Sequence, residues 1–202
     1  MKKITIALIM VISLITPIQT MAESVTQNGT IIEPLEQNIE QIIDEITSEP
    51  RPINSDAIQN VKEYISEYFG NLGYDNIEYQ KFEYNDENNE NAIRHSSQAD
   101  VFLASTAEDA IVDGIGENII VTKNSSIDTT KNLIISAHYD SAEDSVGAND
   151  NGSGVAAVLE LARILKDTEI PYNIKFILFS GEEKYMLGSR WYVGKLTEDE
   201  WK

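Results

Sequence analysis

Thiols, histidines and basic side chains are scarce in this sequence. It contains no cysteine and only two histidines, and 15 Lys+Arg stand against 34 Asp+Glu, for a formal net charge of -19. The lack of cysteine excludes disulfides, so the fold must be held by its hydrophobic core, with metal as the other available support. The acidic balance repels nucleic acid and anionic lipid, so we expect neither as a partner. Most of this charge serves solubility, and only position along the chain can show which carboxylates do more.

Long hydrophobic runs are also missing after the first residues. Two lysines precede the apolar stretch 4–15, a Thr-Pro pair breaks it, and small residues follow up to Ala22. This arrangement predicts a signal peptide over residues 1–22, because the apolar stretch is too short to span a bilayer. We therefore expect a secreted protein, extracellular or periplasmic, with no stable membrane association once the leader is removed. About 180 residues would remain, which is room for one domain with a substantial core.

Beyond the leader, a polar segment precedes a part with clear secondary-structure patterns. Residues 23–53 show only a weak helical pattern, and we interpret them as a pro-segment or as an N-terminal arm packed on the domain. Apolar side chains recur every three or four positions over residues 58–69, and Asn54-Ser55-Asp56 ahead of them offers a helix cap, which predicts an amphipathic helix. The alternating stretch 77–84 predicts a strand.

Three apolar segments, 118–122, 132–137 and 173–179, predict neighbouring strands of one sheet. The last two are nearly continuous apolar runs, which are typical of strands covered on both faces. Residues 155–165 lie between them and predict a helix, so that strand, helix and strand form a parallel unit. The fold class is therefore α/β, with a mixed, mostly parallel central sheet and helices on both faces.

Polar side chains follow the two most apolar strands. His138 and Asp140 come after the first, Glu182 and Glu183 come after the second, and Asp150 lies where the helix between them begins, near the positive end of its dipole. Each group alone is more typical of a solvated surface. In open α/β sheets, however, ligands bind at the carboxyl ends of the strands, so we expect the groups to meet in one crevice. Crowded carboxylates with an imidazole and no thiol favour Zn²⁺, with manganese or cobalt as substitutes.

The string NLIISAHYDS...GANDNGSGVAAVLELARIL...IKFILFSGEE...LGSRWYV resembles the catalytic core of the secreted two-zinc aminopeptidases, exopeptidases related to bacterial leucyl aminopeptidases. The similarity runs from Asn54 to Val193 and is strongest from Leu133 onward. It implies a zinc exopeptidase-like fold, two zinc ions per site and peptide substrates. The implied reaction is removal of N-terminal residues by a zinc-activated water.

The resemblance also implies a role for each site residue. His138, Asp150 and Glu183 are the metal ligands, and Asp150 bridges the two ions. Asp140 holds the imidazole of His138 in the metal-binding tautomer. Glu182 is the general base that takes the proton of the water. The peptide bond that follows Asp150 is expected to be cis.

Other features of that family have no counterpart in this sequence. The family has two further ligands, an acid after the Glu-Glu pair and a later histidine, whereas here Asp199 falls in a helix-capping pattern and His95 lies upstream in a polar loop. We therefore expect residues 54–202 to be a partial zinc peptidase domain that is inactive by itself. Tyr185 stands where the family commonly has glycine, a change that we expect to be tolerated.

Two alternatives stay open. One is a non-catalytic remnant that binds metal or peptide without turnover. The other is a related two-zinc carboxypeptidase or cyclase, because the visible motifs serve the metals and not the substrate. These motifs carry no signal for side-chain preference or for the oligomeric state.

Overall fold

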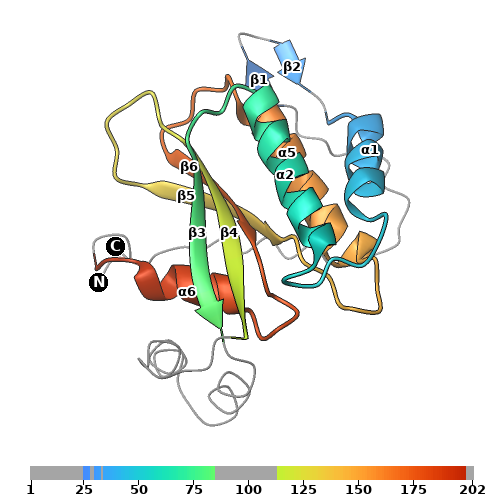
Figure 1. Cartoon of the computed structure of the whole chain (residues 1–202). Helices are drawn as coiled ribbons and strands as arrows, with labels where there is room; N and C mark the ends of the chain where they lie inside the picture. Colours follow the sequence, from blue (N-terminus) through green and yellow to red (C-terminus); the bar gives the residue numbers. More distant parts are fainter. Residues whose placement is uncertain (1–24, 28–29, 33, 85–112, 199–202) are drawn as a thin grey trace.

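The computed structural model describes the chain in four ranges: 25–27, 30–32, 34–84 and 113–198 (Figure 1). The signal peptide predicted for residues 1–22, the loop that contains His95, and Asp199 lie outside these ranges. Two short strands, β1 (Val25–Gln27) and β2 (Thr30–Ile32), pair antiparallel in a small sheet of their own. Among the described residues, no helix is both long and apolar enough to cross a membrane.

A four-stranded sheet forms the centre of the fold, in the order β3-β4-β6-β5 (Figure 1). Its strands are β3 (Ile77–Tyr84), β4 (Gly114–Lys123), β5 (Asn132–His138) and β6 (Asn173–Phe179). β4 pairs antiparallel with both β3 and β6, and β5 pairs parallel with β6. The predicted strands are thus neighbours in one sheet, and the mixed α/β class is confirmed.

The expectation that most pairings are parallel is not met, because only the β5–β6 pairing among the three described ones is parallel. The connections give the reason. No helix lies between β4 and β5, over residues 124–131, so the chain re-enters the sheet from the end at which it left and runs in the opposite direction. Between β5 and β6 a helix carries the chain back to the starting end, which makes those strands parallel.

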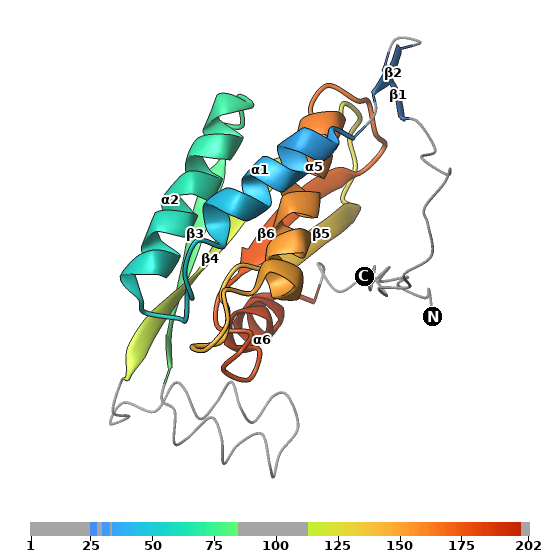
Figure 2. The ribbon, with the colours of Figure 1, turned by 90° about the vertical axis from the view of Figure 1, so that its right-hand side faces the viewer.

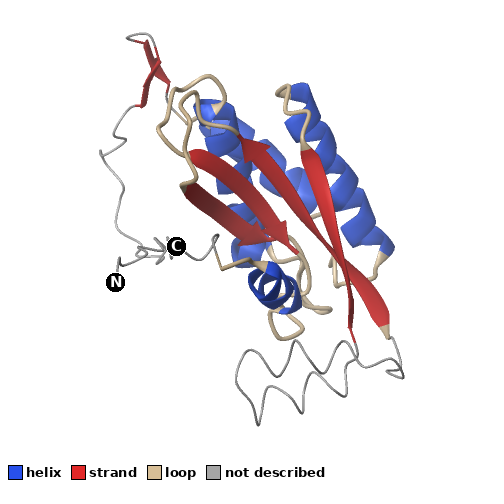
Figure 3. Cartoon of the chain, turned by 90° about the vertical axis from the view of Figure 1, so that its left-hand side faces the viewer, coloured by secondary structure: helices blue, strands red, loops and turns tan. Residues whose placement is uncertain are grey.

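Helices lie on both faces of the sheet, as the sequence predicts. α1 (Glu36–Ile46), α2 (Asp56–Asn71) and α5 (Ser153–Leu165) cover one face (Figure 2). α6 (Leu187–Lys195), which no pattern predicted, lies against one end of the other face (Figure 3). The main core is between the sheet and the first three helices. A smaller cluster around Tyr192 joins α6 to β4 and β6.

The local patterns explain these elements. Ser55 Oγ accepts a hydrogen bond from the backbone N of Ile58 at 3.1 Å, so within the predicted stretch Asn54-Ser55-Asp56 it is Ser55 that caps α2. Phe69, near the other end of α2, is fully buried in the main core. In β6, Phe176 packs into that same core whereas the next residue, Ile177, packs toward α6. The continuous apolar run of β6 therefore marks a strand covered on both faces.

The carboxylate of Glu160 on α5 joins α1 to the rest of the fold. It is buried and accepts hydrogen bonds from the backbone N of Leu35 (2.8 Å) and from Asn38 Nδ2 (2.6 Å) at the start of α1. Arg163, one turn along α5, donates to the same carboxylate at 2.7 and 2.9 Å. Burial raises the pKa of Glu160, but these hydrogen bonds outweigh it and bring the pKa below its ordinary value.

We expect Glu160→Gln to lower the free energy of unfolding by about 1–3 kcal/mol at neutral pH, because the neutral amide keeps only one acceptor oxygen and turns a donor toward the groups that bonded to the other. Since the folded pKa of Glu160 lies below the unfolded one, the carboxylate stabilises the fold above the unfolded pKa. That contribution is lost as the pH falls through the folded pKa. The difference in Tm between wild type and variant should therefore become smaller at acid pH, which thermal unfolding over a range of pH can measure. The exposed Glu63→Gln serves as the control, and a gap that does not change with pH would contradict the assignment.

Candidate metal centre

The predicted site residues gather at the carboxyl ends of β5 and β6. His138 is the last residue of β5, and the parallel register sets it opposite Phe179, the last residue of β6. The loops that follow the two strands therefore leave the sheet side by side, and they carry Asp140 in one case and the Glu182-Glu183 pair in the other. Asp150 comes from the turn Ala148–Gly152, which leads directly into α5.

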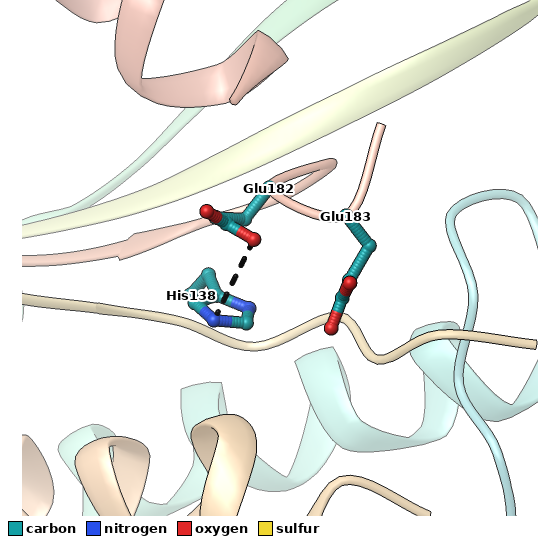
Figure 4. A group of neighbouring side chains, drawn as sticks. All are labelled: His138, Glu182 and Glu183. Atoms are coloured by element: carbon teal, nitrogen blue, oxygen red, sulfur yellow. Dashed lines mark ion pairs between the residues drawn. The ribbon is translucent and has the colours of Figure 1, made fainter. Parts of the chain in front are cut away.

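One nitrogen of His138 faces the acidic side chains. Its Nε2 lies 3.0 Å from Asp150 Oδ1 and 3.9 Å from Glu182 Oε2. Donor atoms of His138, Glu182 and Glu183 all lie within 4.8 Å of one another, and the two glutamates stand on different sides of the imidazole (Figure 4). The structure thus brings His138, Asp150, Glu182 and Glu183 together. Which of them are ligands and which is the base stays a prediction.

Asp140 links the ends of the two strands. It is almost completely buried, and its two carboxylate oxygens accept hydrogen bonds from the backbone N of Glu182 and of Glu183, each at 3.1 Å. On the other side, Nδ1 of His138 lies 3.2 Å from the carbonyl oxygen of Asp140 and 3.6 Å from its Oδ1. A proton on Nδ1 can therefore be donated to Asp140, which leaves the lone pair of Nε2 for a metal. The link to the glutamate amides is an additional role that the motifs did not predict.

The site has a buried floor and an open rim. His138 and Asp140 are buried, whereas the side chains of Glu182 and Asp150 are 41% and 78% exposed. Water and dissolved ligands can reach the exposed carboxylates from solvent. The described part of the site is therefore open to solvent on the side of Glu182 and Asp150.

The pKa values at the site show an excess of negative charge. Burial lowers the pKa of His138, but the carboxylates of Asp140, Glu182 and Asp150 outweigh it and raise the pKa to about 9. Burial raises the pKa of Glu183, and the charge of Asp150 raises it further. Both shifts mean that the site draws in positive charge, which a divalent cation supplies more fully than a proton does.

The donor set fits a zinc ion. The available atoms are an imidazole nitrogen and carboxylate oxygens, which are ligands that Zn²⁺ accepts. Ligand atoms about 2.0–2.2 Å from a tetrahedral ion lie roughly 3.3 Å from one another. The 3.0 Å separation between His138 Nε2 and Asp150 Oδ1, two of the predicted ligand atoms, is close to that value. Among the described residues, His138, Glu182 and Glu183 form a group close enough to hold one ion.

Two features of the surrounding loops bear on the resemblance. The peptide bond between Asp150 and Asn151 is cis, as expected. Asn151 Oδ1 accepts a hydrogen bond from the backbone N of Gly154 at 3.1 Å, and a Cβ atom at position 154 would lie 2.0 Å from that oxygen.

Tyr185 has a positive φ of 68°, a backbone conformation that favours glycine, so the chain keeps the turn with a side chain in place.

Sequence reasoning missed Arg51. The residue is fully buried, and its guanidinium donates hydrogen bonds to the backbone carbonyl oxygens of Tyr139, Val146 and Gly147, in the loop between His138 and Asp150. Its one sequence signal is its place between two prolines, ahead of the cap of α2. Nothing in that pattern indicates which distant loop the side chain reaches.

Comparisons with known proteins identify a matching family and a shared fold. Residues 118–202 match Peptidase family M28. Aminopeptidase YwaD from Bacillus subtilis is 44% identical over 94 residues, which cover 46% of this chain and 21% of YwaD. The fold superposes on that of BSAP, a zinc aminopeptidase from Bacillus subtilis, with a TM-score of 0.64 at 19% identity, over 81% of this chain and 66% of BSAP. Glutaminyl cyclase from Porphyromonas gingivalis gives a TM-score of 0.54 at 19% identity, over 73% of this chain and 45% of that protein.

This chain thus spans about a fifth of YwaD and about two thirds of BSAP. The matched segment nevertheless contains all five predicted site residues. The resemblance inferred from the motifs is confirmed: residues 118–202 match the model of Peptidase family M28, and the chain shares its fold with zinc aminopeptidases.

Proposed function

We propose that this protein is a zinc-dependent exopeptidase, and specifically an aminopeptidase that releases N-terminal residues from peptides. One observation carries the proposal: within the segment that matches Peptidase family M28, the buried His138 turns Nε2 toward the carboxylates of Asp150 and Glu182, and a donor atom of Glu183 lies within 4.8 Å of the same imidazole. An imidazole and carboxylates around one point form the donor set of catalytic zinc sites. The aminopeptidase YwaD, the relative of highest identity described above, supports the class of reaction.

Each side chain has a distinct part in the proposed reaction. His138, Asp150 and Glu183 would hold the metal. When bound, these ions would acidify a water molecule and polarise the scissile carbonyl. Asp140 keeps the imidazole oriented through Nδ1 and fixes the backbone from which both glutamates project.

Glu182 is suited to the role of general base. Its carboxylate borders the donor group, with Oε2 3.9 Å from His138 Nε2, and it is 41% exposed. A base must lie within hydrogen-bond reach of the water that it deprotonates, and it must also reach the leaving group. Glu182 would take a proton from the water and pass it to the departing amine.

The donors in the described residues do not complete a two-metal site. Catalytic zinc usually has three protein ligands per ion, and the described residues offer four acidic or imidazole side chains for both ions together. We therefore expect the 202-residue chain by itself to bind zinc weakly and to show no appreciable turnover. Enzyme-like rates from this chain with zinc alone would contradict that expectation.

The test of the proposal uses the complete protein and an aminoacyl 4-nitroanilide. We expect hydrolysis that a chelator abolishes and that added Zn²⁺ restores. Release of residues from the carboxyl end of a peptide would identify a carboxypeptidase instead, and cyclisation of an N-terminal glutamine would identify a cyclase. Zinc binding without any of these reactions would support the non-catalytic remnant.

A further inference from the structure

Arg51 connects backbone segments on both sides of the candidate site. Its Nε donates to the carbonyl oxygen of Tyr139 at 2.8 Å, and Tyr139 is the residue between His138 and Asp140. Its Nη2 donates to the carbonyl oxygen of Gly147 at 3.1 Å, three residues before Asp150. One rigid, planar group therefore holds the strand end that carries the imidazole and the turn that carries the aspartate.

The turn with Asp150 depends on the same acceptor. The carbonyl oxygen of Gly147 receives a second hydrogen bond, from the backbone N of Gly152 at 2.8 Å, which closes the turn around Asp150. Gly147 has a positive φ of 58°, and a Cβ atom there would lie 2.5 Å from the carbonyl oxygen of Asp150 and 3.3 Å from Arg51 Nη2. The loop is thus packed closely around the guanidinium, and a small shift of Gly147 would move Asp150.

The backbone of Arg51 adds two more links to this loop. Its N–H donates to Ser141 Oγ at 2.9 Å, and its carbonyl oxygen accepts from the backbone N of Ser141 at 3.2 Å. Ser141 Oγ in turn lies 2.8 Å from the carbonyl oxygen of Ser145. Both the side chain and the main chain of Arg51 therefore bind the loop 141–147.

We propose that Arg51 is a positioning residue of the metal centre, which sets the distance between His138 and Asp150 through the loop 141–147. The proposal depends on the metal site proposed above. Arg51 lies outside the segment that matches Peptidase family M28. Arg51 lies near the end of the stretch 23–53, which the sequence suggests as a pro-segment. If part of that stretch is removed on maturation, the cut must lie before Arg51 for the metal site to keep its support.

The first measurement is zinc affinity in the full chain, by competition with a chromophoric chelator, for wild type and for Arg51→Met. We expect about tenfold weaker binding in the variant, because the loop loses the donors that fix it. Phe69→Leu is the matched control, since Phe69 is equally buried but packs against Tyr74 and Phe176, within the main core. If the two variants lost the same amount of Tm and also the same amount of zinc affinity, Arg51 would only support the fold. That result would overturn the proposal.

Arg51→Lys gives a second comparison and serves if Arg51→Met does not fold. A lysine keeps the positive charge, but its single ammonium lacks the planar fork that reaches three carbonyl oxygens. We expect Arg51→Lys to recover most of the Tm but not the zinc affinity. Wild-type affinity in this variant would also overturn the proposal.

Amide hydrogen exchange of the metal-free chain separates this proposal from the proposed function. The N–H of Gly152, which bonds to Gly147, should exchange faster in Arg51→Met than in Phe69→Leu. A wild type that binds no zinc would count against the metal site, whereas the exchange of Gly152 would still decide whether Arg51 holds the turn. Unchanged exchange at Gly152 would reject the positioning role.

Discussion

Replacing Glu182 by Gln in the complete protein is expected to lower kcat by about 10²–10⁴-fold, with little change in KM or in bound zinc. Glutamine has nearly the same size as glutamate. Its backbone N–H can still donate a hydrogen bond to Asp140, so the loop after β6 should not move. What it loses is the ability to take a proton from water. Steady-state kinetics on an aminoacyl 4-nitroanilide, with zinc content measured on the same samples, would check this prediction.

Glu183→Gln is the matched control, because it makes the same chemical change one residue away. Its side chain is the predicted ligand, so this variant should lose zinc together with activity. The contrast matters because donor atoms of both glutamates lie within 4.8 Å of His138. If Glu182→Gln lost zinc and Glu183→Gln kept it, the roles of ligand and base would have to be exchanged.

Asp140→Asn is expected to weaken zinc binding by about 10–100-fold and to lower the free energy of unfolding by about 1–3 kcal/mol. The two carboxylate oxygens of Asp140 accept from two backbone N–H groups, those of Glu182 and Glu183. The amide of asparagine can accept from only one of them and turns a donor toward the other. The variant also removes a negative charge that, with those of Glu182 and Asp150, raises the pKa of His138 to about 9, so the pKa of His138 should fall.

Three measurements check the second prediction: chelator competition for zinc, thermal unfolding, and NMR titration of His138 in the metal-free chain. Asp144→Asn is the control, since it makes the same change of charge on an exposed residue of the neighbouring loop. A control that matched Asp140→Asn in all three measurements would reduce the role of Asp140 to its charge alone. Wild-type zinc affinity in Asp140→Asn would contradict the orienting role of that residue.

Local patterns predicted most of the elements, because the signals are short-range. The strands 77–84 and 173–179 have the predicted limits, and α2 begins after its cap at Ser55. Alternation along a strand and recurrence every three or four residues in a helix follow from backbone geometry within one element, so they are visible without knowing the partner. The helix α6 has no comparable apolar face along its length, and no pattern indicated it.

The candidate site was predictable for a related reason. Polar residues directly after apolar strands, and an acid directly before a helix, occupy positions whose relative place follows from a parallel strand, helix and strand unit. Once β5 and β6 pair in parallel, His138 and the Glu182-Glu183 pair must lie at one edge. Asp150 reaches the same edge because α5 starts there.

The order of residues therefore determined by itself the α/β class, the limits of β3 and β6 and the five side chains of the candidate site, because each depends on neighbours in the chain. Tertiary structure alone decided that β4 runs antiparallel to β6, that Asp140 bonds to both glutamate amides, and that Arg51 lies inside the loop that carries Asp150. Arg51 and Gly147 are 96 positions apart, and no local pattern predicts which carbonyl group a buried guanidinium will bind. That choice is made by packing, which brings together groups with unsatisfied hydrogen bonds wherever the folded backbone leaves them.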